Sequence, residues 1–108
     1  MPIEKLKGSK CSLVVTNADN QLVAYVNGIE IYNRTTKGDP TLNEPPTGFS
    51  NLLQPGLNTL LLIGIGGGAD HHFAGHIQID NTKRKFSKQG SSTKGGKIWD
   101  FAIHIENP

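Results

Sequence analysis

The chain has 108 residues, with 11 basic side chains, 9 acidic side chains and a formal net charge of +2. This length suits a single domain with its own core, and the small net charge excludes a strong overall field as the basis of partner choice. We therefore expect one domain over residues 1–108, with residues 1–10 as a flexible N-terminus.

Glycine and proline occur 13 and 6 times, and apolar residues make up 35% of the chain in strand-length runs. This pattern favours short strands joined by turns over a helical bundle. Cys11 is the only cysteine, so an intrachain disulfide is excluded. The first ten residues lack the apolar stretch of a secretory signal, and no apolar run is long enough to cross a bilayer. We expect a soluble protein without a membrane span, either cytoplasmic or released without a cleaved signal.

The first strands are predicted at residues 12–16 and 21–26, with a turn at residues 17–20. Asn27 and Gly28 both accept positive φ, so they favour a two-residue type I′ hairpin. Such a loop pairs residues symmetrically about it, as Val26 with Ile29, Tyr25 with Glu30, Ala24 with Ile31, and Val23 with Tyr32. Strand alternation then puts Tyr25, Glu30 and Tyr32 on one outer, polar face.

Residues 35–46 are predicted to form a loop, and its length is typical of a functional or mobile segment. Pro55 and Gly56 form a predicted turn before residues 57–65, which are apolar on both faces and therefore predict a central strand. Residues 73–80 and 98–106 alternate as strands. Residues 81–97 contain six basic residues and no acid, which predicts a solvated basic loop or a contact surface for anions. Six or seven strands without a helix predict an all-β antiparallel sandwich or jelly roll.

Two linked segments carry a family resemblance. LVAYVNGIEI, and after a loop FSNLLQPGLNTLLLIG, resemble the galactose-binding-like jelly-roll domain that precedes the catalytic domain of many glycosidases. Val26-Asn27-Gly28 and residues 52–60 match the family pattern residue by residue, and the likeness covers residues 20–80. The resemblance implies a β-sandwich that binds carbohydrate. The matched residues build the scaffold; among them, Asn58 is expected to bond neighbouring backbone as the chain enters the sheet.

Several motifs resemble parts of chemical sites, but none of them predicts one. Residues 64–69 satisfy the G-x-G-x-x-G/A spacing of dinucleotide sites, but a strand pattern follows where that site needs a helix. His72 and His76 lie about 13 Å apart along one strand, too far to share a metal ion. Cys11 has no activating partner and is expected to be buried. We therefore predict no catalysis, no cofactor and no metal.

Carbohydrate binding needs aromatic faces and planar polar groups. Tyr32 is the expected aromatic platform, because the alternation of Trp99 with Phe101 and Ile103 favours a place in the core for the tryptophan. The remaining predicted ligand-binding residues lie beside Tyr32, in the long loop, and among the outward-facing histidines, as Asn33, Arg34, Asp39, His72 and His76.

Three functions follow from these features. The leading hypothesis is a non-catalytic, lectin-like module that binds a glycan or small saccharide and gains avidity as a homo-oligomer. The second is a structural or interaction domain whose sheet face, with Tyr25 or Tyr32, packs on a protein partner. The third is an anionic-surface binder that uses residues 81–97 to contact an acidic glycan, acidic lipid or nucleic acid. Nucleic acid ranks last, because Phe86 is the only aromatic residue there.

Overall fold

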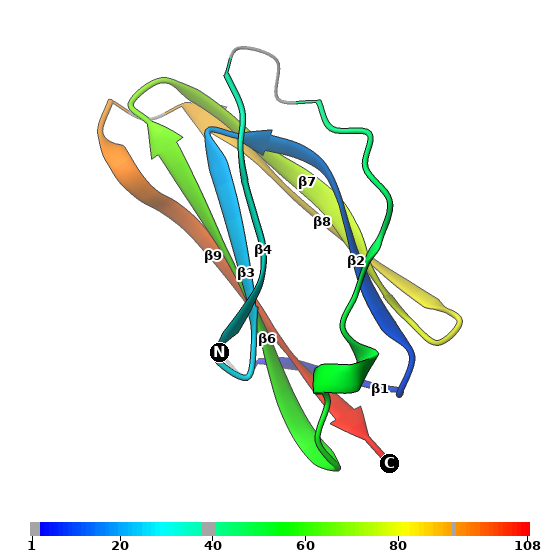
Figure 1. The fold of residues 1–108 in the computed structure, drawn as a ribbon. Coiled ribbons are helices and arrows are strands. Elements are labelled where there is room, and N and C mark those ends of the chain that lie inside the picture. Colours follow the sequence, from blue (N-terminus) through cyan, green and yellow to red (C-terminus); the bar gives the residue numbers. More distant parts are fainter. Residues whose placement is uncertain (1–2, 38–40, 92) are drawn as a thin grey trace.

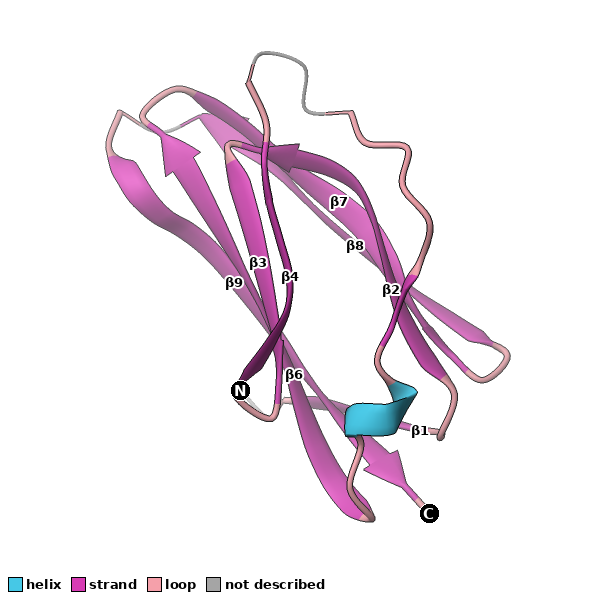
Figure 2. Ribbon diagram, viewed as in Figure 1, coloured by secondary structure: helices cyan, strands magenta, loops and turns pink. Residues whose placement is uncertain are grey.

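The fold is described from a computed structural model that covers residues 3–37, 41–91 and 93–108. These residues form nine strands and one short 3₁₀ helix (Figures 1 and 2). In chain order the elements are β1 (Glu4–Lys7), β2 (Cys11–Asp19), β3 (Gln21–Val26), β4 (Ile29–Thr35), β5 (Thr47–Gly48), η1 (Ser50–Leu52), β6 (Gly56–Gly67), β7 (Asp70–Ile79), β8 (Thr82–Ser91) and β9 (Gly95–Asn107). The predicted first strand is thus longer than expected and absorbs most of the predicted turn at residues 17–20.

The strands form two sheets that pack face to face. The five-stranded sheet has the order β1-β9-β6-β3-β4, and the four-stranded sheet has the order β5-β2-β7-β8. All neighbouring strands are antiparallel except β1 and β9, which are parallel. The predicted all-β sandwich is therefore confirmed. The first ten residues, expected to be a flexible terminus, include β1, which pairs with the C-terminal strand.

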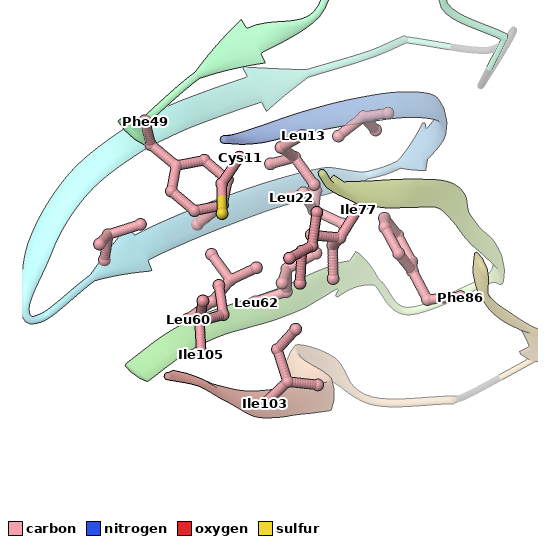
Figure 3. Close-up of a cluster of buried hydrophobic side chains, with 14 of the residues drawn as sticks. Cys11, Leu13, Leu22, Phe49, Leu60, Leu62, Ile77, Phe86, Ile103 and Ile105 are labelled. Atoms are coloured by element: carbon pink, nitrogen blue, oxygen red, sulfur yellow. The ribbon is translucent and has the colours of Figure 1, made fainter. Parts of the chain in front are cut away.

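The core lies between the sheets and follows from strand alternation. Every second side chain of β2, β6 and β7 points inward, and these inward positions carry the apolar residues. Figure 3 shows side chains from both sheets meeting in this layer. The largest fully buried apolar side chains are Leu13, Leu22, Phe49, Leu60, Leu62, Phe73, Ile77, Ile79, Ile103 and Ile105. Cys11 is 4% exposed, as its assignment to the core predicts.

A row of stacked aromatic rings from β7, β8 and β9 extends the core between the two sheets. Trp99 stacks on Phe73 with ring centroids 5.8 Å apart, and on Phe101 at 5.9 Å. Both β9 rings are partly exposed but pack against the buried cluster, so Trp99 lies on the inner side as predicted. Arg84 of β8 caps the stack, with its guanidinium carbon 5.2 Å from the centroid of Phe101.

The hairpin at Asn27-Gly28 forms as predicted, but its register changes partway along. Asn27 and Gly28 have φ values of 51° and 82°, and Val26 faces Ile29 across the turn. Beyond Tyr25, however, a β-bulge places Tyr32 opposite Ala24, where the symmetrical loop predicted Ile31. The extra residue reverses the alternation of β4. Tyr32 consequently packs against the core and no longer shares the outer face of Tyr25 and Glu30.

The predicted basic loop at residues 81–97 is wrong. Asp80 and Asn81 form a two-residue turn, Ile79 faces Thr82, and the chain returns along β7 as the ten-residue strand β8. β8 is the edge strand of its sheet. Edge strands commonly carry lysines, because these discourage pairing with other chains. Solvated loops are also rich in lysine, so the composition of this stretch alone does not distinguish the two. Its outward lysines are consequently held in register with the side chains of β7.

The long segment after β4 closes one side of the sandwich. It runs beside β2 toward η1 (Figure 1). Its backbone is fixed to β2 at both ends, by the N–H of Leu42 to the carbonyl of Thr16 at 2.8 Å and by the N–H of Phe49 to the carbonyl of Cys11 at 3.0 Å. This attachment brings the segment's acidic residue Glu44 toward the side chains of β4.

Candidate functional site

The predicted ligand-binding residues fall in two separate places. Tyr32, Asn33 and Arg34 belong to β4, at the edge of the five-stranded sheet, whereas His72 and His76 belong to β7 in the other sheet. Asp39 lies outside the described residues. The structure therefore offers two candidate sites rather than one.

The β4 site is a pocket of about 330 Å³ between β4 and the segment that follows it. The hydroxyl of Tyr32 donates a hydrogen bond of 2.7 Å to Oε1 of Glu44, and Arg34 forms an ion pair with the same carboxylate. Burial raises the pKa of the Tyr32 hydroxyl, and the nearby Arg34 partly opposes this rise. The Tyr32 hydroxyl, the Arg34 guanidinium and the Glu44 carboxylate therefore satisfy one another. Their contacts attach the segment that carries Glu44 to β4.

Asn33 takes no part in this cluster, because neighbouring residues of a strand point to opposite faces. Its Oδ1 accepts a hydrogen bond of 2.7 Å from Nε2 of Gln21 on β3. Asn33 therefore points away from Tyr32 and Arg34, the two residues with which the sequence groups it.

The outward side of the four-stranded sheet is called the β7 face here. It carries mostly polar side chains from β2, β7 and β8, held at defined register by the strand pairing. Its residues are Ser12, Val14, Asn17, Asp19, Asp70, His72, Ala74, His76, Gln78, Lys83, Lys85, Ser87, Gln89 and Ser91.

One row of the β7 face crosses three strands. Asp19 of β2 faces His72 of β7, which faces Gln89 of β8, so a carboxylate, an imidazole and an amide stand side by side. Asp70 and Ser91 face each other in the next outward row. These five residues line an open pocket of about 620 Å³ at the end of the sheet. The pocket combines hydrogen-bond donors and acceptors on rigid strands.

Asp19 and Gln89 are site residues that sequence reasoning missed. The sequence predicts a turn at Asp19 and a loop at Gln89, whereas both residues lie in strands. No alternation marks Gln89, because every residue from 82 to 91 except Phe86 is polar or glycine.

His71 contributes to the floor of this pocket, but its ring belongs to the interior. The side chain is 5% exposed, and its ring stacks on Phe73 with centroids 5.8 Å apart. Neither ring nitrogen has a hydrogen-bond partner among the described residues. Because the ring is buried and stacked in the interior, we do not assign His71 the role of a ligand-binding histidine. Its unpaired nitrogens have a cost in folding free energy, as do other buried polar groups without a partner.

The opposite end of the β7 face is cationic. His76 faces Lys85 directly, and Lys83 lies one outward position further along β8. Together with Thr16, Ala74, Gly75, Phe86 and Ser87 they line a hollow of about 300 Å³. Partial burial lowers the pKa of His76, and the two lysines lower that pKa further.

The described residues include no group of three or more His, Cys, Asp or Glu side chains placed to hold a metal ion. None of the helical structure in these residues is long and apolar enough to span a membrane. Comparisons of the chain with protein-family models, with curated proteins and with solved structures find no match.

Proposed function

We propose that this chain is a non-catalytic, lectin-like carbohydrate-binding module of the galactose-binding-like type, and that the β7 face is its binding surface. The observation that carries the proposal is the row of Asp19, His72 and Gln89 across three neighbouring strands. A saccharide presents hydroxyls in fixed directions. Side chains anchored on paired strands present acceptors and donors in equally fixed directions, which keeps the entropic cost of binding low.

The pocket's chemistry suits hydroxyl recognition. The Asp19 and Asp70 carboxylates accept hydrogen bonds, the Gln89 amide both donates and accepts, and the His72 imidazole does the same in its neutral form. The pocket is open, so each copy would bind a short saccharide weakly. We therefore propose that the module acts as an oligomer, in which several weak sites combine.

A saccharide panel tests this function. Galactose, glucose, mannose and N-acetylglucosamine would be titrated into ¹⁵N-labelled protein, with amide shifts expected around His72 and Gln89 for at least one sugar. Gln89→Ala should weaken that sugar at least tenfold, which corresponds to about 1.4 kcal/mol. Gln21→Ala, an amide loss on the other sheet, is the matched control and should leave affinity unchanged. No response to any sugar of the panel would refute a simple saccharide site.

A specific observation also favours the second function, an interaction domain. On β6, Leu61, Ile63 and Ile65 alternate with buried residues and lie partly exposed on the outward side of the five-stranded sheet, next to Tyr25 of β3. Partly exposed apolar side chains grouped in this way are typical of a protein contact surface. Light scattering of wild type and of Ile63→Lys distinguishes this function, because only a contact through this face would be lost in the variant.

A further inference from the structure

The cationic end of the β7 face has an unbalanced charge. Lys85 lies directly opposite His76, and Lys83 lies directly opposite Gln78. Residues paired in this way point to the same side of a sheet, so both ammonium groups share the outward side with the imidazole. Lys83 and Lys85 occupy successive outward positions of β8, and both line the hollow beside His76, so their positive charges add at this place.

No acidic side chain of the described residues neutralises these lysines. Lys7 and Arg84 pair with Glu106 and Glu4, but Lys83 and Lys85 form no ion pair within the described part of the chain. Asp80, the carboxylate nearest to them in sequence, is engaged elsewhere. Its Oδ1 accepts the backbone N–H groups of Lys10 and Ser9, at 2.9 Å and 3.3 Å.

The cationic end is also hollow, and the row of Asp19, His72 and Gln89 lies on the same outward side of the sheet. The outward row between the two ends consists of Asn17, Ala74 and Ser87, of which the residues on β7 and β8 have small side chains. His72 and His76 lie on the same side of β7, about 13 Å apart along the strand. This span exceeds the width of one sugar ring, so a chain of sugars fits the face better than a single sugar.

We propose that the β7 face binds an acidic glycan, with a sulfate or carboxylate group held by His76, Lys83 and Lys85 and neutral sugar hydroxyls held by Asp19, His72 and Gln89. This inference rests on the proposed function and adds the class of saccharide to it. The two ends of the face bind different groups of the glycan. The lysines attract the anion, and the row of Asp19, His72 and Gln89 binds the ring hydroxyls.

Nucleic acid also offers anions, but the face lacks what single-stranded nucleic acid needs. Bases bind to exposed aromatic platforms, whereas Phe86, the aromatic residue of β8, is 5% exposed and points into the core. Phe86 lines the hollow at the cationic end, but a ring this deeply buried offers no open face on which a base could stack. The arrangement thus favours an acidic glycan over an oligonucleotide.

The experiment compares a heparin-derived tetrasaccharide with its desulfated, N-acetylated counterpart by NMR titration and calorimetry. We expect the sulfated probe to bind at least tenfold more tightly, with amide shifts at Ala74, His76, Lys85 and Ser87. The double variant Lys83→Gln/Lys85→Gln should lose that tenfold preference. Lys88→Gln is the matched control. Lys88 faces Phe73, on the opposite side of β8, and its loss should leave the preference intact. Thermal melting checks that all variants fold.

The outcomes separate the two proposals. If the panel sugars bind but sulfation adds nothing, or if Lys88→Gln weakens the sulfated probe as much as the double variant does, the acidic-glycan inference is overturned and the saccharide module stands. If the sulfated probe binds through Lys83 and Lys85 while no neutral sugar binds, the anion site is supported and the neutral pocket fails. If an oligonucleotide of equal charge binds as tightly as the tetrasaccharide, the glycan assignment is wrong.

Discussion

The side-chain amide of Asn27 donates a hydrogen bond of 2.8 Å to Oδ1 of Asn58, and this contact joins two turns that are 31 residues apart. Asn27 also accepts the backbone N–H of Thr59 at 2.9 Å, and Asn58 accepts that of Gln54 at 2.8 Å. Asn58 is 1% exposed, and its Nδ2 donates to the carbonyls of Gln54 and Gly56. Several residues that carry the family resemblance therefore form one hydrogen-bond network, which is centred on the buried side chain of Asn58.

Replacing Asn58 by alanine should destabilise the fold strongly. The change removes the side chain that satisfies several buried backbone groups, and each unsatisfied group costs about 1–3 kcal/mol. We expect a loss of about 3 kcal/mol in the free energy of unfolding, measured by urea denaturation. Asn51→Ala, at an exposed position of η1, is the control and should change this value by less than about 0.5 kcal/mol. Equal effects of the two substitutions would contradict the network.

Gly75 of β7 should not tolerate alanine. A Cβ at this position would collide with the carbonyl oxygen of Val14 and lie 2.9 Å from Cζ of Phe86. One contact is with backbone and the other with a core ring, so neither can yield easily. We expect Gly75→Ala to cost about 3 kcal/mol of stability in thermal or urea unfolding. Gly48→Ala has open space around its Cβ and should be nearly neutral; a neutral Gly75→Ala would show that β2 and β7 are further apart.

Cys11 should be unreactive while the protein is folded. Burial, followed by the negative charge of Asp80, raises the pKa of the thiol from 9.0 to about 11. At pH 8 the thiolate fraction should be roughly a hundredfold smaller than in the unfolded chain, because each pKa unit is a factor of ten. A thiol reagent should label native protein at least a hundredfold more slowly than protein in urea. Rapid native labelling would place Cys11 at the surface.

Local signals in the sequence predicted much of the scaffold. Asn27-Gly28 and Pro55-Gly56 are read from neighbouring residues alone, and strand alternation correctly places His72 and His76 on the same face. The bulge at Ile31 was not predictable in this way, because it depends on how β4 packs against the segment that carries Glu44. Local patterns thus define turns and faces, whereas tertiary packing defines register.

The candidate site was only half predictable for a related reason. Asp19 and Gln89 stand beside His72 because β2 and β8 both pair with β7, and strand order is not encoded in alternation. The sequence shows the lysines of β8 but not the pairing of β8 with β7. A run of basic residues whose pairing is unknown is typical of a solvated loop. A polar, lysine-rich stretch that directly follows a predicted strand should be tested as an edge strand before it is assigned to a loop.

The pKa of His76 should depend both on the charges of Lys83 and Lys85 and on whether an anion is bound beside it. Partial burial and the charges of Lys83 and Lys85 lower its pKa below 6.5; Val14, which faces it from β2, and Gln78 and Ala74 on β7 carry no charge. The imidazole therefore gains its proton at a lower pH than an unperturbed histidine does. An anion held beside it favours the charged form, so its binding should raise the pKa of His76 and should strengthen as the pH falls through that pKa.

This coupling is measurable from the Cε1 proton of His76 by NMR. In free protein its midpoint should lie below that of an unperturbed histidine, and Lys83→Gln/Lys85→Gln should move it upward, because two repelling charges are removed. The sulfated tetrasaccharide should move it upward in wild type and much less in the double variant. Lys88→Gln should leave the free midpoint unchanged. If the double variant titrates like wild type, the lysine charges do not act on His76. That result would contradict a single anion site formed by His76, Lys83 and Lys85.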